Sequence, residues 1–294
     1  MARKQKNLVS GSGILALTVE KAPPLWYRIA VNTPRFGRPL LERMRDRNKL
    51  NRAAYFKFHE SKMAIPLYWL SPCDVTNVFG RRIRRFAEVC SSNLGEHDFI
   101  DCGANLGTFA AQFTRFSPHV HKLIAIEPNP ELFPLMRLNL SNAARAQETV
   151  PLNAAVSDKE GRCRLVAPAG KWAKDAFYIE EDPNGDIPII TLSTVLQSCN
   201  MPRVAIKLDV EGAEVPTLMG GAEQIGALDR VVLFVEFHKD VLARIGMSDR
   251  EMLGRIDDLR QFRWIDSATD LPIDRSRSVF DQSDPHQCDL IAIG

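Results

Sequence analysis

The chain lacks the cysteine patterns that mark zinc sites and disulfide frameworks. Its 294 residues include six cysteines, but none belongs to a Cys-x-x-Cys pair and their spacing is irregular. Structural zinc sites and disulfide scaffolds are recognised by paired, regularly spaced cysteines. We therefore expect reduced thiols and a cytoplasmic protein.

A long hydrophobic run is also missing. The apolar stretch at residues 14–19 follows several basic residues, but Glu20 and Lys21 end it and no small-residue cleavage pattern comes next. A membrane-spanning helix needs about 20 apolar residues, and a secretory signal needs a cleavage site. The sequence predicts a soluble protein, with a loose contact with a membrane surface left open.

A strong net charge is absent from the chain as a whole. The formal net charge is +2, which is too small to indicate a polyanionic partner by itself. Residues 35–85, however, contain thirteen Lys or Arg and four Asp or Glu, a balance of +9. This basic segment either contacts an anionic surface, such as a lipid or a nucleic acid, or is an ordinary solvated face.

What the chain does contain is a glycine-rich turn between a strand and a helix. The stretch Asp101-Cys102-Gly103-Ala104-Asn105-Leu106-Gly107 follows a short apolar run and precedes helical apolar spacing at 108–113. Gly103 permits a tight turn, Gly107 permits close packing of helix on strand, and the first helical N–H groups attract a negative group. Asn105 stands where a dinucleotide-binding turn has glycine, which favours a smaller ligand end.

A carboxylate follows at the end of the next apolar run. Glu127 comes directly after residues 122–126 and twenty-four residues after Gly103. At this position a carboxylate can accept hydrogen bonds from both hydroxyls of an adenosine ribose. Together with the glycine turn, Glu127 predicts a site for S-adenosylmethionine, and the alternative is a plain strand-to-helix turn beside a solvated Glu.

Strand and helix patterns alternate from residue 96 to the end of the chain. This alternation is typical of an α/β domain with a mainly parallel sheet and helices on both faces. Residues 1–24 are expected to form a flexible arm, and residues 25–95 a mainly helical extension or cap. Ligands of such sheets bind at the carboxyl ends of the strands, so the loops that follow Cys102, Glu127, Asp209 and Glu236 should meet at one edge.

Individual elements can be predicted from the same patterns. Short amphipathic helices are expected at 40–44 and 55–58, and longer helices at 81–90, 130–142, 214–225 and 249–262. A single strand is expected at 149–156, a long polar loop at 167–185, and a last strand at 288–293.

Six ionisable residues gather at two later strand ends. Alternation along a strand places Lys207 and Asp209 on one face, and does the same for Glu236 and His238. Glu211 and Glu214 are three residues apart at the start of a helix and therefore share one side of it.

Three interpretations of these six residues remain open. They are a structural one, in which the acids favour a helix N-terminus and Lys207 pairs with Asp209; a magnesium site built from oxygen ligands; and a general base, Asp209 or His238, with Lys207 and Glu211 beside it. The candidate magnesium ligands are Asp209, Glu211, Glu214 and Glu236.

These motifs together resemble the FkbM family of S-adenosylmethionine-dependent methyltransferases. The resemblance covers about residues 98–262 and rests on four ordered blocks and a terminal Glu-x-His. The blocks are residues 100–107, 126–130, 153–158 and 206–214, and the Glu-x-His is residues 236–238.

The resemblance implies a Rossmann-like methyltransferase fold with seven strands, the last of them antiparallel, over residues 96–294. It implies that Asp101, Gly103, Asn105 and Gly107 surround the methionine part of the cofactor and that Glu127 holds the ribose. Further positions follow from the same resemblance: Asn153, Ala155 and Val156 near the adenine, and Asp209 near the sulfonium.

The resemblance also indicates the reaction. Family members are usually O-methyltransferases of saccharides, glycolipid-like molecules or secondary metabolites, so we expect a small-molecule or glycan acceptor. Two alternatives remain: a nicotinamide-dependent oxidoreductase of the same fold, and a non-catalytic module that binds nucleic acid or anionic lipid through residues 35–85. Nucleic-acid methylation is disfavoured, because Val210-Glu211-Gly212 stands where a base-clamping Pro-Pro-Tyr sequence is expected.

Overall fold

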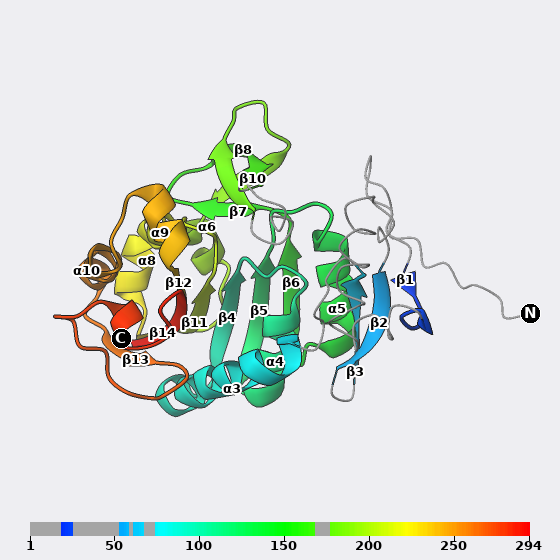
Figure 1. Ribbon diagram of the computed structural model, residues 1–294, viewed down its shortest axis with the longest axis horizontal. Helices are drawn as coiled ribbons and strands as arrows, with labels where there is room; N and C mark the ends of the chain where they lie inside the picture. The colour runs from blue at the N-terminus through cyan, green and yellow to red at the C-terminus, as the bar shows by residue number, and fades with distance from the viewer. Residues whose placement is uncertain (1–18, 26–52, 59–60, 68–73, 168–176) are drawn as a thin grey trace, which may run out of the picture.

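A central seven-stranded sheet organises the part of the chain that the structure describes. The computed structural model describes residues 19–25, 53–58, 61–67, 74–167 and 177–294 (Figure 1). Across the sheet the strands are β13 (Arg263–Asp266), β14 (Gln287–Ile293), β12 (Arg230–His238), β11 (Arg203–Leu208), β4 (His97–Cys102), β5 (Val120–Ile126) and β6 (Glu148–Leu152). The strands from β12 to β6 pair in parallel, whereas β14 is antiparallel to β12 and β13. This sheet confirms the Rossmann-like methyltransferase fold.

Helices cover both faces of this sheet (Figure 1). One face packs against α3 (Asp74–Leu94), α4 (Thr108–Phe116) and α5 (Phe133–Ala143), and the other against α6 (Leu192–Gln197), α7 (Glu214–Met219), α8 (Ala222–Ala227) and α10 (Asp249–Leu259). Strand alternation produces the two cores, because Phe99 and Phe234 face the first set while Ile100 and Leu233 face the second. The helix expected at 81–90 lies within α3, where Phe86 packs on Phe99, 6.2 Å between ring centroids.

Two small sheets flank the central one. The side sheet has the order β7 (Ala155–Ser157), β10 (Ile187–Thr191), β8 (Gly161–Val166) and β9 (Tyr178–Glu181), and it lies above the carboxyl ends of the central strands in Figure 1. The other contains β1 (Val19–Glu20), β2 (Ala53–Phe58) and β3 (Ser61–Pro66). It is joined to α5 through Asn139, whose Nδ2 donates to the Ala64 carbonyl (3.0 Å) and whose Oδ1 accepts from the Ala64 N–H (2.6 Å).

Several sequence predictions of local structure are wrong. Residues 55–58 belong to a strand rather than a helix, because β2 pairs antiparallel with β3. The strand expected at 149–156 is two strands in different sheets, β6 and β7. The helix expected at 214–225 is interrupted at Gly220, where an added Cβ would lie 2.3 Å from the Ser157 carbonyl oxygen. The polar loop expected at 167–185 contains the strand β9. The strand β13 is not among the elements that the sequence patterns predict.

The remaining local predictions agree with the structure or fall outside it. Helices α5 and α10 and the strand β14 lie where the sequence places them, within three residues at each end. Of the arm predicted at 1–24, residues 1–18 lie outside the described residues, as does the helix predicted at 40–44, whereas residues 19–20 form β1. Among the helices that are described, none is both long and apolar enough to cross a membrane.

Candidate functional site

The glycine turn after β4 brings two strand ends into contact. Gly103 has a φ of +77°, and a Cβ at this position would lie 1.8 Å from the carbonyl oxygen of Asp209. Gly107, with a φ of +73°, precedes α4 and packs against Leu140, whose side chain would be 3.0 Å from an added Cβ. A side chain at either position would therefore be both strained and crowded. The two glycines allow the loop after β11 and the helix α5 to pack closely against the turn between β4 and α4.

Asn105, in the glycine turn, is joined by a hydrogen bond to Glu127. The Asn105 N–H donates to Oε2 of Glu127 (2.7 Å), and the Asn129 N–H donates to Oε1 (2.8 Å). Burial raises the pKa of Glu127 to about 7, against the opposing effect of these two hydrogen bonds. Oδ1 of Asn105 is buried and has no hydrogen-bond partner among the described residues. The pair therefore offers acceptor oxygens to a ligand with hydroxyl or amino groups.

A cavity opens beside these residues at the carboxyl ends of the strands. The empty space within it, together with the open mouth, is about 710 Å³, and its lining combines apolar side chains with a few polar ones, as in small-molecule sites. Seven residues predicted from the sequence line it: Gly103, Asn105, Glu127, Ala155, Val156, Asp209 and Glu211. The structure thus brings six of the nine predicted cofactor residues to one cavity, together with two predicted catalytic residues, Asp209 being counted in both groups.

Three predicted cofactor residues stand behind the cavity wall. Asn153 donates from Nδ2 to the carbonyl oxygens of Glu127 (2.8 Å) and Pro128 (3.1 Å), so it shapes the loop that carries Glu127. Asp101 is fully buried next to Lys207, and Gly107 packs against the side chain of Leu140. These three residues therefore support the wall of the cavity and do not line it.

The sequence prediction missed part of the apolar wall. Leu165, Phe177 and Ile179 line the cavity from the side sheet, and Leu132 and Val210 line it from the central domain. Phe177 and Ile179 lie within the segment 167–185, which was expected to be a polar loop, and Leu165 lies just before it. The signal available in the sequence was the alternation of Leu165 with Cys163 and of Phe177 with Ile179, which is typical of paired strands.

Lys207 is the buried positive charge of the site. Its Nζ lies 3.2 Å from Asp101 Oδ1 and 3.0 Å from Asp209 Oδ2, and it donates to the carbonyl oxygen of Gly103 (2.8 Å). Burial alone would lower the pKa of Lys207, but the carboxylates of Asp101 and Asp209 outweigh burial and raise it. For Asp101, burial dominates and raises the pKa although Lys207 opposes it. Lys207 therefore stays charged and ties β4 to the loop after β11.

The loop after β11 presents Glu211 to the cavity. Glu211 has a φ of +54°, an uncommon conformation for a residue with a side chain. Burial, with the charge of Asp209 adding to it, raises the pKa of Glu211 to about 7. Glu214 has a different role, because its carboxylate accepts from the N–H groups of Val210 (3.1 Å) and Gly212 (3.1 Å) and so holds the loop.

The four proposed magnesium ligands do not form one cluster. Glu214 is engaged by backbone amides, and Glu236 is engaged by Gln287 and His238. In the described part of the chain, one ligand atom each of Asp209, Glu211 and His238 lies within 4.8 Å of the others. Magnesium prefers an all-oxygen shell, so this group with an imidazole gives no support for magnesium.

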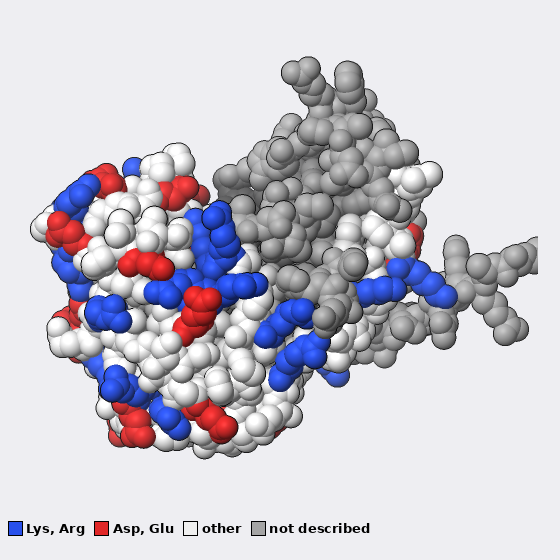
Figure 2. All heavy atoms as spheres, turned by 90° about the horizontal axis from the view of Figure 1, so that it is seen from below, with Lys and Arg blue, Asp and Glu red and all other residues white. Residues whose placement is uncertain are grey.

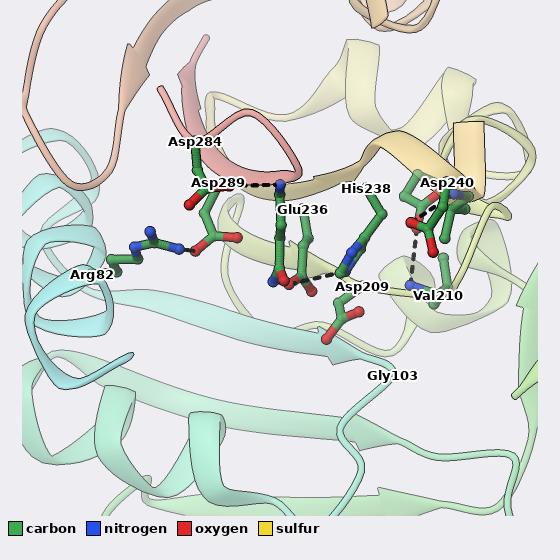
Figure 3. A network of polar contacts seen from close by, with 12 residues as sticks. Arg82, Gly103, Asp209, Val210, Glu236, His238, Asp240, Asp284 and Asp289 are labelled. Carbon is green, nitrogen blue, oxygen red and sulfur yellow. Dashed lines mark hydrogen bonds and ion pairs between the residues drawn. The ribbon is translucent and has the colours of Figure 1, made fainter. Parts of the chain in front are cut away.

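Glu236 and His238 face the same side of β12, as predicted. His238 Nε2 lies 3.2 Å from Glu236 Oε1, and the amide of Gln287 donates to the same oxygen. Burial, and after it the charge of Asp209, raises the pKa of Glu236. Figure 3 shows these side chains converging between β12, β14 and the loop after β11, with the Arg82–Asp289 ion pair (2.6 Å) beside them at the left.

The basic N-terminal segment is only partly described. Residues 35–52 lie outside the described residues, whereas four of its arginines lie on α3. Three of these arginines have partners: Arg82 pairs with Asp289, Arg85 with Asp270, and Arg84 lies 4.6 Å from the centre of the Phe116 ring. On the face shown in Figure 2, acidic side chains are interspersed among the basic ones. Contact of this segment with an anionic surface stays a prediction.

Comparison with known families assigns the chain to one of them. The profile that describes the methyltransferase FkbM domain matches residues 101–263, which include the end of β4, the strands β5, β11 and β12, and every residue that lines the cavity. No protein with a curated description matches the sequence.

Solved structures with a similar arrangement are distant in sequence. Precorrin-6y C5,15-methyltransferase from Geobacter metallireducens is 14% identical, with a TM-score of 0.35 and alignment over 70% of this chain and 86% of that chain. TYW2 from P. horikoshii, in complex with MeSAdo, is 13% identical, with a TM-score of 0.41 over 82% and 70% of the two chains. Magnesium protoporphyrin IX methyltransferase from Synechocystis PCC 6803, with bound SAH, is 9% identical, with a TM-score of 0.38 over 73% and 84%.

Proposed function

Because the chain belongs to the FkbM methyltransferase family, we propose that it is an S-adenosylmethionine-dependent O-methyltransferase. Its acceptor would be a hydroxyl group of a saccharide, a glycolipid or a secondary metabolite. The observation that carries the proposal is the strand-end cavity, which Asn105, Glu127, Asp209 and Glu211 all line.

The residues of the cavity fit the cofactor chemically. Glu127 offers a carboxylate to the ribose hydroxyls, and Oδ1 of Asn105 is a buried acceptor without a partner, suited to the cofactor's amino group. Ile126, Ala155, Leu165 and Ile179 give an apolar lining for the adenine ring. Gly103 lets the loop after β11 pack directly on the turn after β4, since a Cβ there would collide with the Asp209 backbone.

The chain's own residues would position the acceptor and take its proton. When bound, S-adenosylmethionine supplies an activated methyl group on a positively charged sulfur. Burial opposes ionisation of Asp209, but Lys207 outweighs it and lowers the pKa of Asp209, so this carboxylate is charged at neutral pH. Asp209 orients the acceptor hydroxyl, and Asp209 or His238 accepts its proton as the oxygen becomes nucleophilic. The apolar walls exclude water that would compete for the methyl group.

The first test is calorimetric titration of the purified protein with S-adenosylhomocysteine. We expect micromolar binding that weakens at least about thirtyfold in Glu127→Ala, because the carboxylate that accepts the ribose hydroxyls is lost. Glu131→Ala removes an exposed carboxylate four residues away and serves as the matched control, with unchanged affinity. Repeating the titration with EDTA and then magnesium tests for a metal requirement. Protection by NADH in place of S-adenosylhomocysteine would support an oxidoreductase and contradict the proposal.

Binding of S-adenosylhomocysteine should also depend on pH. Glu127 has a pKa near 7 in the free protein, and its ionised form accepts hydrogen bonds with both oxygens. Protonation below pH 7 removes an acceptor, so the affinity should rise by up to about tenfold from pH 6 to pH 8, with a proton released on binding. Titrations at three pH values measure the slope. The slope should disappear in Glu127→Gln and persist in Glu211→Gln, the control for the other group that titrates near 7.

A further inference from the structure

Arg244 joins two walls of the cavity from outside. It lies in the last turn of α9 (Lys239–Ile245), which directly follows β12, and its side chain is exposed. In Figure 1, α9 lies below the side sheet. One of the two walls is the loop after β11, which carries Glu211, and the other is β9 together with Phe177 just before it.

The peptide group between Glu211 and Gly212 is held at both ends. Its carbonyl oxygen accepts from Arg244 Nη2 (2.5 Å), and its N–H donates to the carboxylate of Glu214 (3.1 Å). The φ angles on either side are +54° at Glu211 and +102° at Gly212, so the loop has a conformation that needs such support. A Cβ on Gly212 would lie 3.1 Å from Cγ2 of Ile245, so the loop packs directly on α9. These contacts fix the backbone from which the Glu211 side chain reaches the cavity.

The guanidinium of Arg244 also stacks on an aromatic ring of β9. Its Cζ lies 4.3 Å from the centre of the Tyr178 ring. Tyr178 stands between Phe177 and Ile179, which line the cavity, and strand alternation turns its side chain to the opposite face. A planar guanidinium can stack on a ring while its N–H groups donate at the edge. Arg244 therefore connects β9 with the loop after β11.

The two ends of the side sheet are attached differently. At one end β7 is fixed to α7, because Thr217 Oγ1 donates to the Val156 carbonyl (3.0 Å) and Gly220 packs closely on the Ser157 carbonyl. At the other end β9 is the outer strand and pairs with β8. The contact of Tyr178 with Arg244 gives β9 a second attachment. Displacement of β9 from the loop after β11 would widen the cavity, and this attachment opposes it.

Resting on the proposed function, we propose that Arg244 and Tyr178 are positioning residues that form a clasp between β9 and the loop after β11. The clasp holds Phe177 and Ile179 against the bound cofactor and keeps Glu211 in its place in the cavity. S-adenosylhomocysteine, which remains after methyl transfer, has to leave past this wall. The clasp therefore slows its release.

Surface plasmon resonance with S-adenosylhomocysteine over immobilised protein tests the clasp. Arg244→Met and Tyr178→Leu should each raise the dissociation rate at least about fivefold and leave the association rate within about twofold, because each removes one half of the link. Tyr178→Phe keeps the ring face and should restore slow release. Arg164→Met is the matched control, since it breaks an exposed pair with Glu180 within the side sheet. Unchanged release in Arg244→Met, or fast release in Tyr178→Phe, overturns the proposal.

Combination of the two substitutions distinguishes one clasp from two separate contacts. Either change alone already breaks the link between β9 and the loop. Arg244→Met combined with Tyr178→Leu should therefore release S-adenosylhomocysteine within about twofold of the faster single variant. Single effects that multiply in the combined variant overturn the proposal.

Amide hydrogen exchange of the ligand-free protein tests the clasp without any cofactor. Tyr178→Leu should speed exchange at least about threefold in the peptide that contains residues 209–214, because the ring supports Arg244, which in turn holds that loop. Residues 287–293 of β14 should exchange as in the unmodified protein and serve as the reference. Unchanged exchange at 209–214 overturns the proposal. If the protein does not bind S-adenosylhomocysteine, the proposed function fails while this exchange still decides whether the clasp exists.

Discussion

Replacement of Asp209 by Asn is expected to abolish methyl transfer almost completely. The amide cannot accept the proton of the hydroxyl, and it no longer carries the charge that pairs with Lys207 at 3.0 Å. Loss of a positioned acid or base commonly costs about 10²–10⁴ in rate, and loss of the orienting charge adds to this. Transfer of a labelled methyl group from S-adenosylmethionine to a panel of saccharide and polyketide hydroxyls measures the effect.

The same substitution should leave the cofactor site largely intact. Glu127 and Asn105, which also line the cavity, are unchanged, so the affinity for S-adenosylhomocysteine should change by less than about tenfold. Asp229→Asn makes the same chemical change at an exposed position before β12 and should have normal activity. Near-normal turnover of Asp209→Asn would remove Asp209 from the mechanism and leave His238 as the proton acceptor.

The sequence predicts this site best where backbone geometry leaves little choice of residue. Gly103 could be recognised because only glycine permits a tight turn there, and the structure shows the Asp209 carbonyl against the place of a Cβ. Glu127 could be placed because it ends the strand next to that turn. Lys207 and Asp209 share a face through simple strand alternation, and their ion pair follows from it.

Residues brought in by distant elements could not be predicted in the same way. Leu165 and Ile179 reach the cavity because β8 and β9 pair with each other, and such pairing depends on tertiary packing rather than local pattern. Gln287 reaches Glu236 because β14 runs antiparallel beside β12. Residues 55–58 show the same limit, since a short apolar run fits a helix or a strand equally well and only its pairing with β3 decides.

Removal of the buried charge of Lys207 should have the largest effect on stability. Lys207→Met keeps much of the side-chain volume but leaves Asp101, which is fully buried, and Asp209 without their partner. Breaking a buried ion pair from one side costs about 3–5 kcal/mol. Urea unfolding at pH 7, followed by circular dichroism, measures the change in the free energy of unfolding. Lys159→Met is the matched control, since its pair with Glu181 is exposed and its loss should leave the free energy of unfolding almost unchanged.

The pH dependence of Lys207→Met identifies the cause of its instability. Burial already raises the pKa of Asp101 in the presence of Lys207, and without the lysine it should rise further. An acid whose pKa is higher in the folded state than in the unfolded state stabilises the fold below its unfolded pKa, and this stability is lost as the pH rises through the folded pKa. The deficit of Lys207→Met should therefore grow from pH 5 to pH 8, and Asp101→Asn in the same protein should recover part of it. A deficit that is independent of pH would mean that lost packing, including the contact of Lys207 with the Phe109 ring at 5.5 Å, outweighs the unpaired charge.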